Sequence, residues 1–207
     1  KYKKKLLKIF SEIRAVKKWK SNTLHMILKD NLKKPAVFFS KDELVSGYRY
    51  LVKKGKLKPD PKLEKVIRMK PGRTMSGVAV VTVLTKPYEC PGKCIYCPDE
   101  EGLPKSYVSK EPGAQRALEN KFDPYLQVFN RLAALKNLGH SVDKVELIIL
   151  GGTWDFYPED YKIWFVTECF RALVDGVRPR RGQTPSWNNL FHLHHLNETA
   201  RSRCVGL

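Results

Sequence analysis

Residues 78–84 read VAVVTVL, and residues 90–98 read CPGKCIYCP. The first string is a nearly continuous apolar run rich in β-branched residues, the pattern of a strand buried on both faces of a parallel sheet. The second string follows this strand closely, and its prolines and glycine favour a loop. Because the reactive groups of α/β barrel enzymes lie at the carboxyl ends of strands, the two strings predict an α/β fold with a reactive loop.

The loop carries three thiols, Cys90, Cys94 and Cys97, spaced by three residues and then by two. A structural zinc site takes four protein ligands and closes around the metal. A cube of four irons and four sulfurs also takes four ligands, one for each iron. Three cysteines therefore leave one iron with an open coordination position, and an open iron–sulfur cluster is the favoured interpretation.

Two other interpretations of the cysteines are weaker. A disulfide framework is disfavoured because the chain has 5 cysteines and no secretory signal, which together suggest a reducing cytosol. A zinc site needs a fourth ligand, and none of the candidate histidines has the usual local spacing. The candidates are His140, His192, His194 and His195.

The residues after the cysteine loop alternate between helix and strand patterns, the order of a parallel α/β fold. Gly151-Gly152-Thr153 closes the second strand as the cysteine loop closes the first, so we expect the two loops to be neighbours in space. The first predicted helix runs from Pro124 to about Leu138 and is capped by Asp123. The elements expected after it are a strand over 145–150, a helix over 159–173, a mobile excursion over 176–185, a helix over 187–200 and a strand over 204–207.

Charge divides the chain into two unequal parts. Residues 1–74 hold 23 Lys and Arg against 6 Asp and Glu, whereas residues 75–207 hold 16 against 15, so nearly all of the net charge of +18 lies in the first third. Such a block usually marks a polyanion-binding module, and a solvated lysine-rich surface is the alternative. No apolar run approaches the roughly 18 residues of a membrane span, and the sequence predicts a cytoplasmic protein.

The basic block is predicted to be a small helical domain. Apolar residues recur every three or four positions from Lys5 to about Lys20, which indicates an amphipathic helix. A second helix begins after Ser40, which forms a capping-box pattern with Glu43, and stops near Gly55. A proline-rich stretch over 59–72 is predicted to be a linker, which gives domains over 1–70 and 71–207. Four aromatic residues could stack on bases but are favoured as core, namely Phe38, Phe39, Tyr48 and Tyr50.

Several motifs together carry a resemblance to a known family. The cysteine spacing, with Tyr96 before the last cysteine, resembles the signature of the radical S-adenosylmethionine superfamily. The wider pattern over residues 70–207 is similar to the catalytic subunit of Elongator, a family of tRNA wobble-uridine carboxymethylating enzymes, and the short first gap is typical of its archaeal or bacterial members. The further motifs are Thr74 to Val81, Lys86-Pro87, Ser106-Tyr107, Glu111-Pro112, Phe122-Asp123-Pro124-Tyr125, Gly139 to Glu146, Gly151-Gly152-Thr153 and Asn197-Glu198-Thr199-Ala200.

The resemblance implies a fold and a set of cofactor contacts. Residues 71–207 would form part of a radical S-adenosylmethionine (TIM-like) barrel, preceded by the basic, mainly helical domain. The ligands of a 4Fe–4S cluster would be Cys90, Cys94 and Cys97, those of S-adenosylmethionine would be Tyr96, Gly151, Gly152 and Thr153, and Lys144 would contact acetyl-CoA. The family also carries a second half-barrel and an acetyltransferase-like domain, so we expect these 207 residues not to complete the reaction alone.

The reaction that the resemblance implies uses two substrates. A 5′-deoxyadenosyl radical abstracts hydrogen from the methyl group of acetyl-CoA, the carbon radical adds to carbon 5 of the wobble uridine, and water releases the carboxymethyl product and CoA. The implied partners are the anticodon stem-loop region of a tRNA, held by the basic domain, a reductant for the cluster, and other Elongator-type subunits or a second copy of the chain.

Two other functions remain open at this level. One is another radical enzyme that acts on RNA, of the methylthiotransferase type, which often needs a second cluster. Only Cys169 and Cys204 remain for one, far apart in the sequence, and both are predicted to be core cysteines. The other is a non-catalytic tRNA-binding module with a zinc site.

Overall fold

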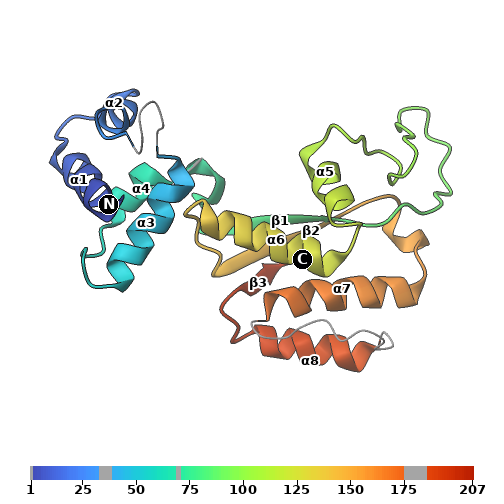
Figure 1. Ribbon diagram of the computed structural model, residues 1–207. Coiled ribbons are helices and arrows are strands. Elements are labelled where there is room, and N and C mark those ends of the chain that lie inside the picture. Colours follow the sequence, from blue (N-terminus) through green and yellow to red (C-terminus); the bar gives the residue numbers. More distant parts are fainter. Residues whose placement is uncertain (1, 33–38, 69–70, 175–185) are drawn as a thin grey trace. The chain divides into compact units, whose positions relative to one another are not determined.

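The computed structural model describes residues 2–32, 39–68, 71–174 and 186–207. The chain divides into two compact units, one of Lys1–Met75 with Leu135–His140 and one of Ser76–Ala134 with Ser141–Leu207 (Figure 1). Within the described residues, no helix is long and apolar enough to cross a membrane. The predicted excursion over 176–185 lies outside the described residues.

The first unit is helical. Its elements are α1 (Tyr2–Ala15), α2 (Thr23–Asp30), α3 (Lys41–Lys53), α4 (Pro61–Ile67) and the 3₁₀ turn η1 (Pro71–Thr74). One apolar core joins the helices, because each presents a stripe of residues three or four apart to the same interior. The central members of this core are Ile9 and Phe10 of α1, Leu44, Tyr48 and Leu51 of α3, and Leu63 and Ile67 of α4.

Local sequence signals explain where these helices begin and end. Ser40 and Glu43 form the capping box at the start of α3, as predicted, and Gly55 follows α3 with a φ of +65°, a conformation that glycine adopts readily. Two predictions were wrong. The first helix begins at Tyr2 and ends at Ala15, earlier than expected, and Tyr50 is exposed rather than core.

The predicted linker over 59–72 contains a helix. Asp60 accepts hydrogen bonds from the backbone N–H groups of Lys62 and Leu63, and Pro61 occupies the first helical position of α4. A proline at that position is favourable, since its missing N–H has no partner there in any helix. The prolines therefore start a helix here. Helix α2 was also missed, although Leu24, Ile27 and Leu28 stand at helical spacing in it and pack on the core.

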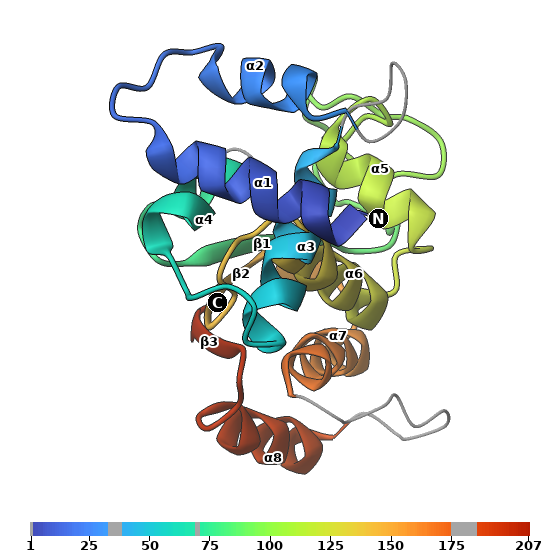
Figure 2. The ribbon, with the colours of Figure 1, turned by 60° about the vertical axis from the view of Figure 1, so that its left-hand side comes forward.

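The second unit contains a three-stranded parallel sheet. The strands β1 (Ala79–Leu84), β2 (Lys144–Leu150) and β3 (Arg203–Gly206) follow one another in the order β1-β2-β3. Helices α5 (Pro112–Glu119), α6 (Pro124–Asn137), α7 (Glu159–Leu173) and α8 (Trp187–Asn197) connect them, and η2 (Trp154–Phe156) precedes α7. The end of α6 belongs to the first unit. α8 lies beside α7 in both views (Figures 1 and 2).

The strands are buried mainly on one face. Ala79, Val81 and Val83 of β1 are fully buried, whereas Val80 is 38% exposed, and β2 alternates in the same way over its first five residues. The prediction of burial on both faces was therefore wrong for this chain. The second face is partly covered by α5, since Leu84 packs with Leu103 and the alanines of α5, and Arg116 of α5 donates to the Thr82 hydroxyl at 2.9 Å. Helix α5 itself was not predicted.

Side-chain amides complete the edges of the sheet. Gln127 of α6 accepts a hydrogen bond from the N–H of Leu84 and donates one to its carbonyl, both at 2.9 Å, so it substitutes for a neighbouring strand at the edge of β1. Asn197 at the end of α8 does the same for the start of β3, where it accepts from the N–H of Cys204 and donates to the carbonyl of Ser202. Both amides are buried, and buried polar groups of this kind need such partners.

Candidate functional site: a cysteine loop beside a double glycine

The cysteine loop begins shortly after β1 ends and is open to solvent. Cys94 is exposed, and Cys90 and Cys97 are half-buried. The two residues between the second and third cysteines point outward, with Ile95 86% and Tyr96 91% exposed. The N–H of Cys97 donates to the carbonyl of Cys94 at 3.3 Å, which makes a tight turn of this part of the loop. The thiols and Tyr96 are thus accessible to a ligand.

The double glycine lies next to this loop, as expected from the strand order. The sulfur of Cys90 is 3.4 Å from the hydroxyl oxygen of Thr153, the residue directly after Gly151-Gly152. The Thr153 hydroxyl lowers the pKa of the Cys90 thiol, and the backbone N–H of Gly92 adds to the effect. Both interactions favour the thiolate, which is the form that binds metals.

Gly151 is required by the packing of the two strand ends. It has a φ of +158°, and a Cβ atom at this position would lie 1.9 Å from the Thr85 hydroxyl oxygen, far inside any permitted contact. Gly152 differs, because the nearest atom to its Cβ position is the Tyr157 hydroxyl at 3.9 Å. Gly151 therefore lets β2 end against β1, while Gly152 leaves space for a ligand.

Thr85 and Tyr157 hold this junction, although no motif in the sequence points to either residue. The Tyr157 hydroxyl donates to the carbonyl of Lys86 at 2.9 Å and lies 2.8 Å from the Thr85 hydroxyl, which consequently donates to it. Thr85 donates its N–H to the carbonyl of Leu150, which extends the β1–β2 pairing by one step. Its position directly after a strand was the only sequence signal for Thr85.

Stacked aromatic rings support the chain that leads into the loop. Tyr157 stacks between Tyr88 at 5.0 Å and Tyr161 at 5.1 Å, measured between ring centroids. The Nζ atom of Lys86 lies 4.8 Å from the centroid of the Tyr161 ring, and burial raises the pKa of the Tyr161 hydroxyl. The chain between β1 and the cysteines is therefore anchored on α7 and on the segment before it.

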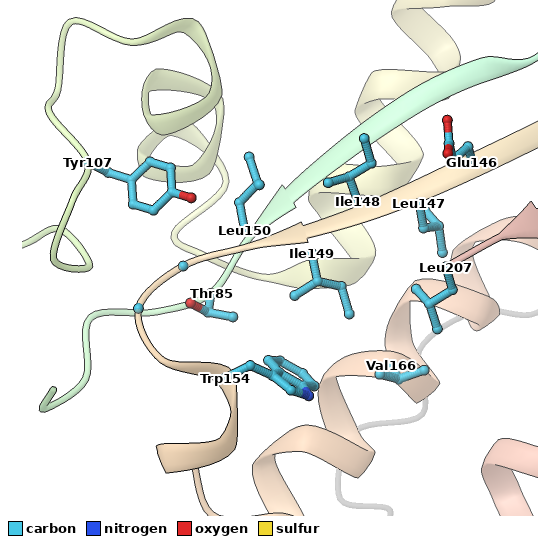
Figure 3. A pocket seen from close by; sticks show the side chains of 12 residues that line it. Thr85, Tyr107, Glu146, Leu147, Ile148, Ile149, Leu150, Trp154, Val166 and Leu207 are labelled. Atoms are coloured by element: carbon cyan, nitrogen blue, oxygen red, sulfur yellow. The ribbon is translucent and has the colours of Figure 1, made fainter. Parts of the chain in front are cut away.

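A cavity of about 580 Å³ opens at the carboxyl end of β2 (Figure 3). Tyr107 and Leu150 line it on one side of the strand, and Ile149, Trp154 and Val166 on the other. Gly151 and Gly152 form its end, and the volume falls in the range typical of small-molecule sites. A second, more polar cavity adjoins Cys90, Tyr88 and Lys105. Space for a ligand thus lies both at the end of β2 and beside Cys90.

Other residues singled out from the sequence are not brought to this junction. Lys144 is the first residue of β2 and is exposed, so it lies at the other end of the strand, about 23 Å from Gly151 at roughly 3.3 Å per residue. His192, His194 and His195 lie exposed on α8, and His140 is buried in the first unit 2.9 Å from the Thr74 hydroxyl.

The two remaining cysteines have structural surroundings. Cys169 is fully buried on α7, which confirms the prediction of a core cysteine, and burial raises the pKa of its thiol. Cys204 is half-buried in β3, and its thiol lies 3.2 Å from the carbonyl of Gly206.

The loop residues fit an iron–sulfur cluster in their chemistry. A Cβ atom added to Gly92 would lie 3.5 Å from the sulfur of Cys94 and 3.6 Å from that of Cys90, so the glycine leaves a small recess between two thiols. Across the described residues, however, no group of three His, Cys, Asp or Glu side chains converges on a single point. Two of the three thiols of the loop, those of Cys90 and Cys94, thus face one recess.

The basic unit presents its charge to solvent. Four lysines in and after the last turn of α3 are all exposed, namely Lys53, Lys54, Lys56 and Lys58. Arg14 is paired with Asp60 at 2.8 Å, but the 23 basic residues of positions 1–74 far outnumber the acids that could pair with them. This surface suits a polyanion.

Fold and site define an α/β protein with an exposed cysteine loop at the carboxyl edge of a parallel sheet. No protein-family model matches the chain. It is 43% identical over 148 residues to the tRNA uridine(34) acetyltransferase of Methanocaldococcus infernus, over 69% of this chain and 26% of that protein. The protein of the same name from Dehalococcoides mccartyi is 44% identical over 135 residues (65% and 28%), and Elongator complex protein 3 of Bos taurus is 40% identical over 152 residues (68% and 26%).

The chain belongs to the family of the tRNA uridine(34) acetyltransferases and Elongator complex protein 3. It spans about a quarter of the length of the curated relatives that it matches. A solved structure, the archaeal Methanocaldococcus infernus Elp3 with an N-terminal deletion (1–46), aligns with a TM-score of 0.42 and 32% identity, over 62% of this chain and 21% of that one.

Proposed function

We propose that this chain forms the cofactor-binding part of a cytoplasmic radical S-adenosylmethionine enzyme that carboxymethylates the wobble uridine of tRNA. Its sheet would be the first part of a TIM-like barrel. The ligands of a 4Fe–4S cluster would be Cys90, Cys94 and Cys97. The names of the relatives support a tRNA uridine substrate, and the three-cysteine donor set supports the type of chemistry.

The contact between Cys90 and Thr153 is the observation that carries this proposal. It joins two loops that are 63 residues apart in sequence, and each follows a neighbouring strand of one parallel sheet. Such a junction is where parallel α/β proteins bind their ligands. A bound cluster with an open iron would supply the electron for reductive cleavage of S-adenosylmethionine to methionine and a 5′-deoxyadenosyl radical.

The residues of the junction would bind and orient S-adenosylmethionine. Gly151 fixes the turn against Thr85, and Gly152 leaves the backbone open to the methionyl group. Tyr96, exposed beside the last cysteine, is available to the adenine. The apolar walls of the cavity at the end of β2 would exclude water from the reacting atoms.

Lys144 is proposed to contact acetyl-CoA away from this junction. Because it lies at the opposite end of β2, its removal should leave the cleavage of S-adenosylmethionine unchanged. We expect Lys144→Ala to weaken acetyl-CoA binding about tenfold or more, the effect of losing one charged hydrogen bond, with Lys162→Ala as the control. Equal affinity in the two variants would remove Lys144 from the proposal.

The basic unit is proposed to hold the tRNA backbone near its anticodon stem-loop. The exposed lysines after α3 are suited to phosphate contacts, which carry affinity but little sequence information. A cluster reductant and either further Elongator-type subunits or a second copy of the chain complete the proposed partners.

Anaerobic reconstitution with iron and sulfide tests the central claim. We expect about four irons per chain and, after reduction with S-adenosylmethionine present, 5′-deoxyadenosine. Zinc bound in place of iron would favour a zinc-containing tRNA-binding module. Iron binding without 5′-deoxyadenosine formation would indicate an iron–sulfur protein of another type. Either of these two results would contradict the proposed enzyme.

A further inference from the structure

Two hydroxyl groups from outside the cysteine motif contact two of its three sulfurs. The Ser106 hydroxyl oxygen lies 3.0 Å from the sulfur of Cys97, and the Thr153 hydroxyl oxygen lies 3.4 Å from that of Cys90. They come from different segments, since Ser106 follows the cysteines in the chain and Thr153 follows β2. The first and last cysteines of the motif therefore each have one hydroxyl neighbour.

The backbone of Ser106 indicates that this placement is not incidental. Ser106 has a φ of +79°, a left-handed conformation that is uncommon for a residue with a Cβ atom. Its N–H donates at 3.1 Å to the carbonyl of Pro98, the residue after Cys97. The serine is thus fixed to the cysteine loop by its backbone as well as by its side chain. Strained residues of this kind cluster at functional sites.

The direction of these hydrogen bonds is determined by the chemistry of a metal-bound cysteine. A thiol can donate or accept, but a thiolate has no proton and can only accept. When the cysteines act as thiolate ligands, both hydroxyls must donate to sulfur. A donor reduces the negative charge on a thiolate, and hydrogen bonds to the sulfurs are one of the factors that set the potential of an iron–sulfur cluster.

We propose that Ser106 and Thr153 are positioning residues that donate hydrogen bonds to the cluster thiolates of Cys97 and Cys90, raise the reduction potential of the cluster and slow its loss. This inference rests on the proposed function, because it needs a cluster on the loop. It adds a second role to Thr153, which the resemblance assigns only to S-adenosylmethionine, and it gives Ser106 a role that concerns the cluster itself.

Redox titration of the reconstituted protein, followed by electron paramagnetic resonance without S-adenosylmethionine, tests the proposal. Ser106→Gly removes the hydroxyl and tolerates the positive φ, and Thr153→Val removes a hydroxyl at nearly constant volume. We expect a more negative midpoint potential for each, a larger shift for the double variant, and potentials restored by Thr153→Ser. Because S-adenosylmethionine is absent, its contact with Thr153 cannot produce the shift.

Ser109→Ala is the matched control. Ser109 lies near Ser106, but its N–H and side chain face Glu100 rather than a sulfur, so this variant should keep the wild-type potential. As a second measurement, we expect iron transfer to a chelator to be on the order of tenfold faster in the Ser106 and Thr153 variants, the usual effect of losing an outer partner of a metal ligand.

The outcomes separate this inference from the proposed function. If the unaltered protein binds no iron–sulfur cluster, the proposed function fails first. If it binds the cluster, and Ser106→Gly and Thr153→Val retain both its potential and its rate of iron loss, the hydroxyls have no role at the cluster and the inference is wrong. If a variant is too unstable to titrate, the chelator rate of the other variant decides.

Discussion

The two units of this chain differ in where their polar contacts lie. The basic unit is held by one apolar core whose members recur at helical spacing along α1, α3 and α4. Polar contacts between residues far apart in sequence occur in both units, such as Arg14 with Asp60 in the first unit. In the second unit they lie at the strand ends, where Gln127 binds Leu84 and Thr85 contacts Tyr157. The apolar core of the first unit places few constraints on the identity of its surface residues. The strand-end contacts of the second unit fix the positions of individual atoms.

This difference matches the tasks proposed for the two units. Binding a nucleic-acid backbone needs positive charge on a stable scaffold, and it depends little on the place of each lysine. Orienting a small cofactor needs groups held within a fraction of an ångström. The comparison therefore predicts large local effects in the second unit and small, additive ones in the first.

The largest effect is expected from a single thiol of the cysteine loop. Cys94 is exposed, so Cys94→Ser should leave the fold intact and yet abolish cluster binding and 5′-deoxyadenosine formation. The measurements are iron per chain after anaerobic reconstitution and product by chromatography. Cys204→Ser, at a half-buried cysteine of β3, should keep its iron. A Cys94→Ser protein with about four irons per chain would exclude the three-cysteine site.

The tRNA affinity of the basic unit should fall by a small amount with each lysine that is neutralised. Replacing Lys54 and Lys56 by glutamine should weaken tRNA binding and lower the slope of log affinity against log salt by up to about 2, close to one unit for each phosphate that is no longer neutralised. The control replaces Lys110 and Arg201, exposed residues of the second unit, in the same way. Equal slopes for the two double variants, measured by filter binding, would contradict the assignment of tRNA binding to this unit.

The junction of the two strands should be sensitive to one added methyl group. Gly151→Ala places a Cβ atom 1.9 Å from the Thr85 hydroxyl oxygen and should destabilise the sheet by about 1–3 kcal/mol, as overpacking does. Gly152→Ala meets its nearest atom at 3.9 Å and should cost much less. Hydrogen exchange of the β1 and β2 amides measures the difference, and Thr85→Ala should partly restore the Gly151→Ala protein.

The same contrast explains how much could be predicted from the sequence. Periodicity and capping are local signals, and they located α3, α6, α7 and the three strands to within a few residues. The neighbouring positions of the cysteine loop and the double glycine also followed, because parallel strands bring their carboxyl ends to one edge. Strand order was enough to place two loops that are far apart in the chain.

No local sequence pattern predicts the contacts that hold the ends of β1 and β2 together. Thr85 and Tyr157 are 72 residues apart, and only the folded chain brings their hydroxyls to 2.8 Å. The resemblance assigns Gly151 to S-adenosylmethionine, and no sequence pattern indicated its close approach to the Thr85 side chain. The prolines of 59–72 were interpreted as a linker, although Asp60 before Pro61 is itself a helix-start signal.

The smallest predicted effect concerns that helix start in the basic unit. Asp60 caps α4 and pairs with Arg14, so Asp60→Ala should lower the local stability of α4 by about 1 kcal/mol, while Asp60→Asn keeps a capping oxygen and should lose less. The N–H of Leu63 and the Arg14 guanidinium hold the pKa of Asp60 below its usual value. The stabilisation is therefore present above about pH 4 and disappears as the pH falls through the lowered pKa.

Hydrogen exchange of the α4 amides, compared between neutral and acid pH, measures this effect. The difference between the wild type and Asp60→Ala should shrink as the pH falls, and Asp30→Ala, at the end of α2, should show little difference at any pH. A gap between wild type and Asp60→Ala that stayed constant into acid would mean that the carboxylate charge does not stabilise α4. If Asp60→Ala also lowered the hydrogen-exchange protection of β1 and β2, the two units would not unfold separately. The difference between the units would then concern what they bind and not their stability.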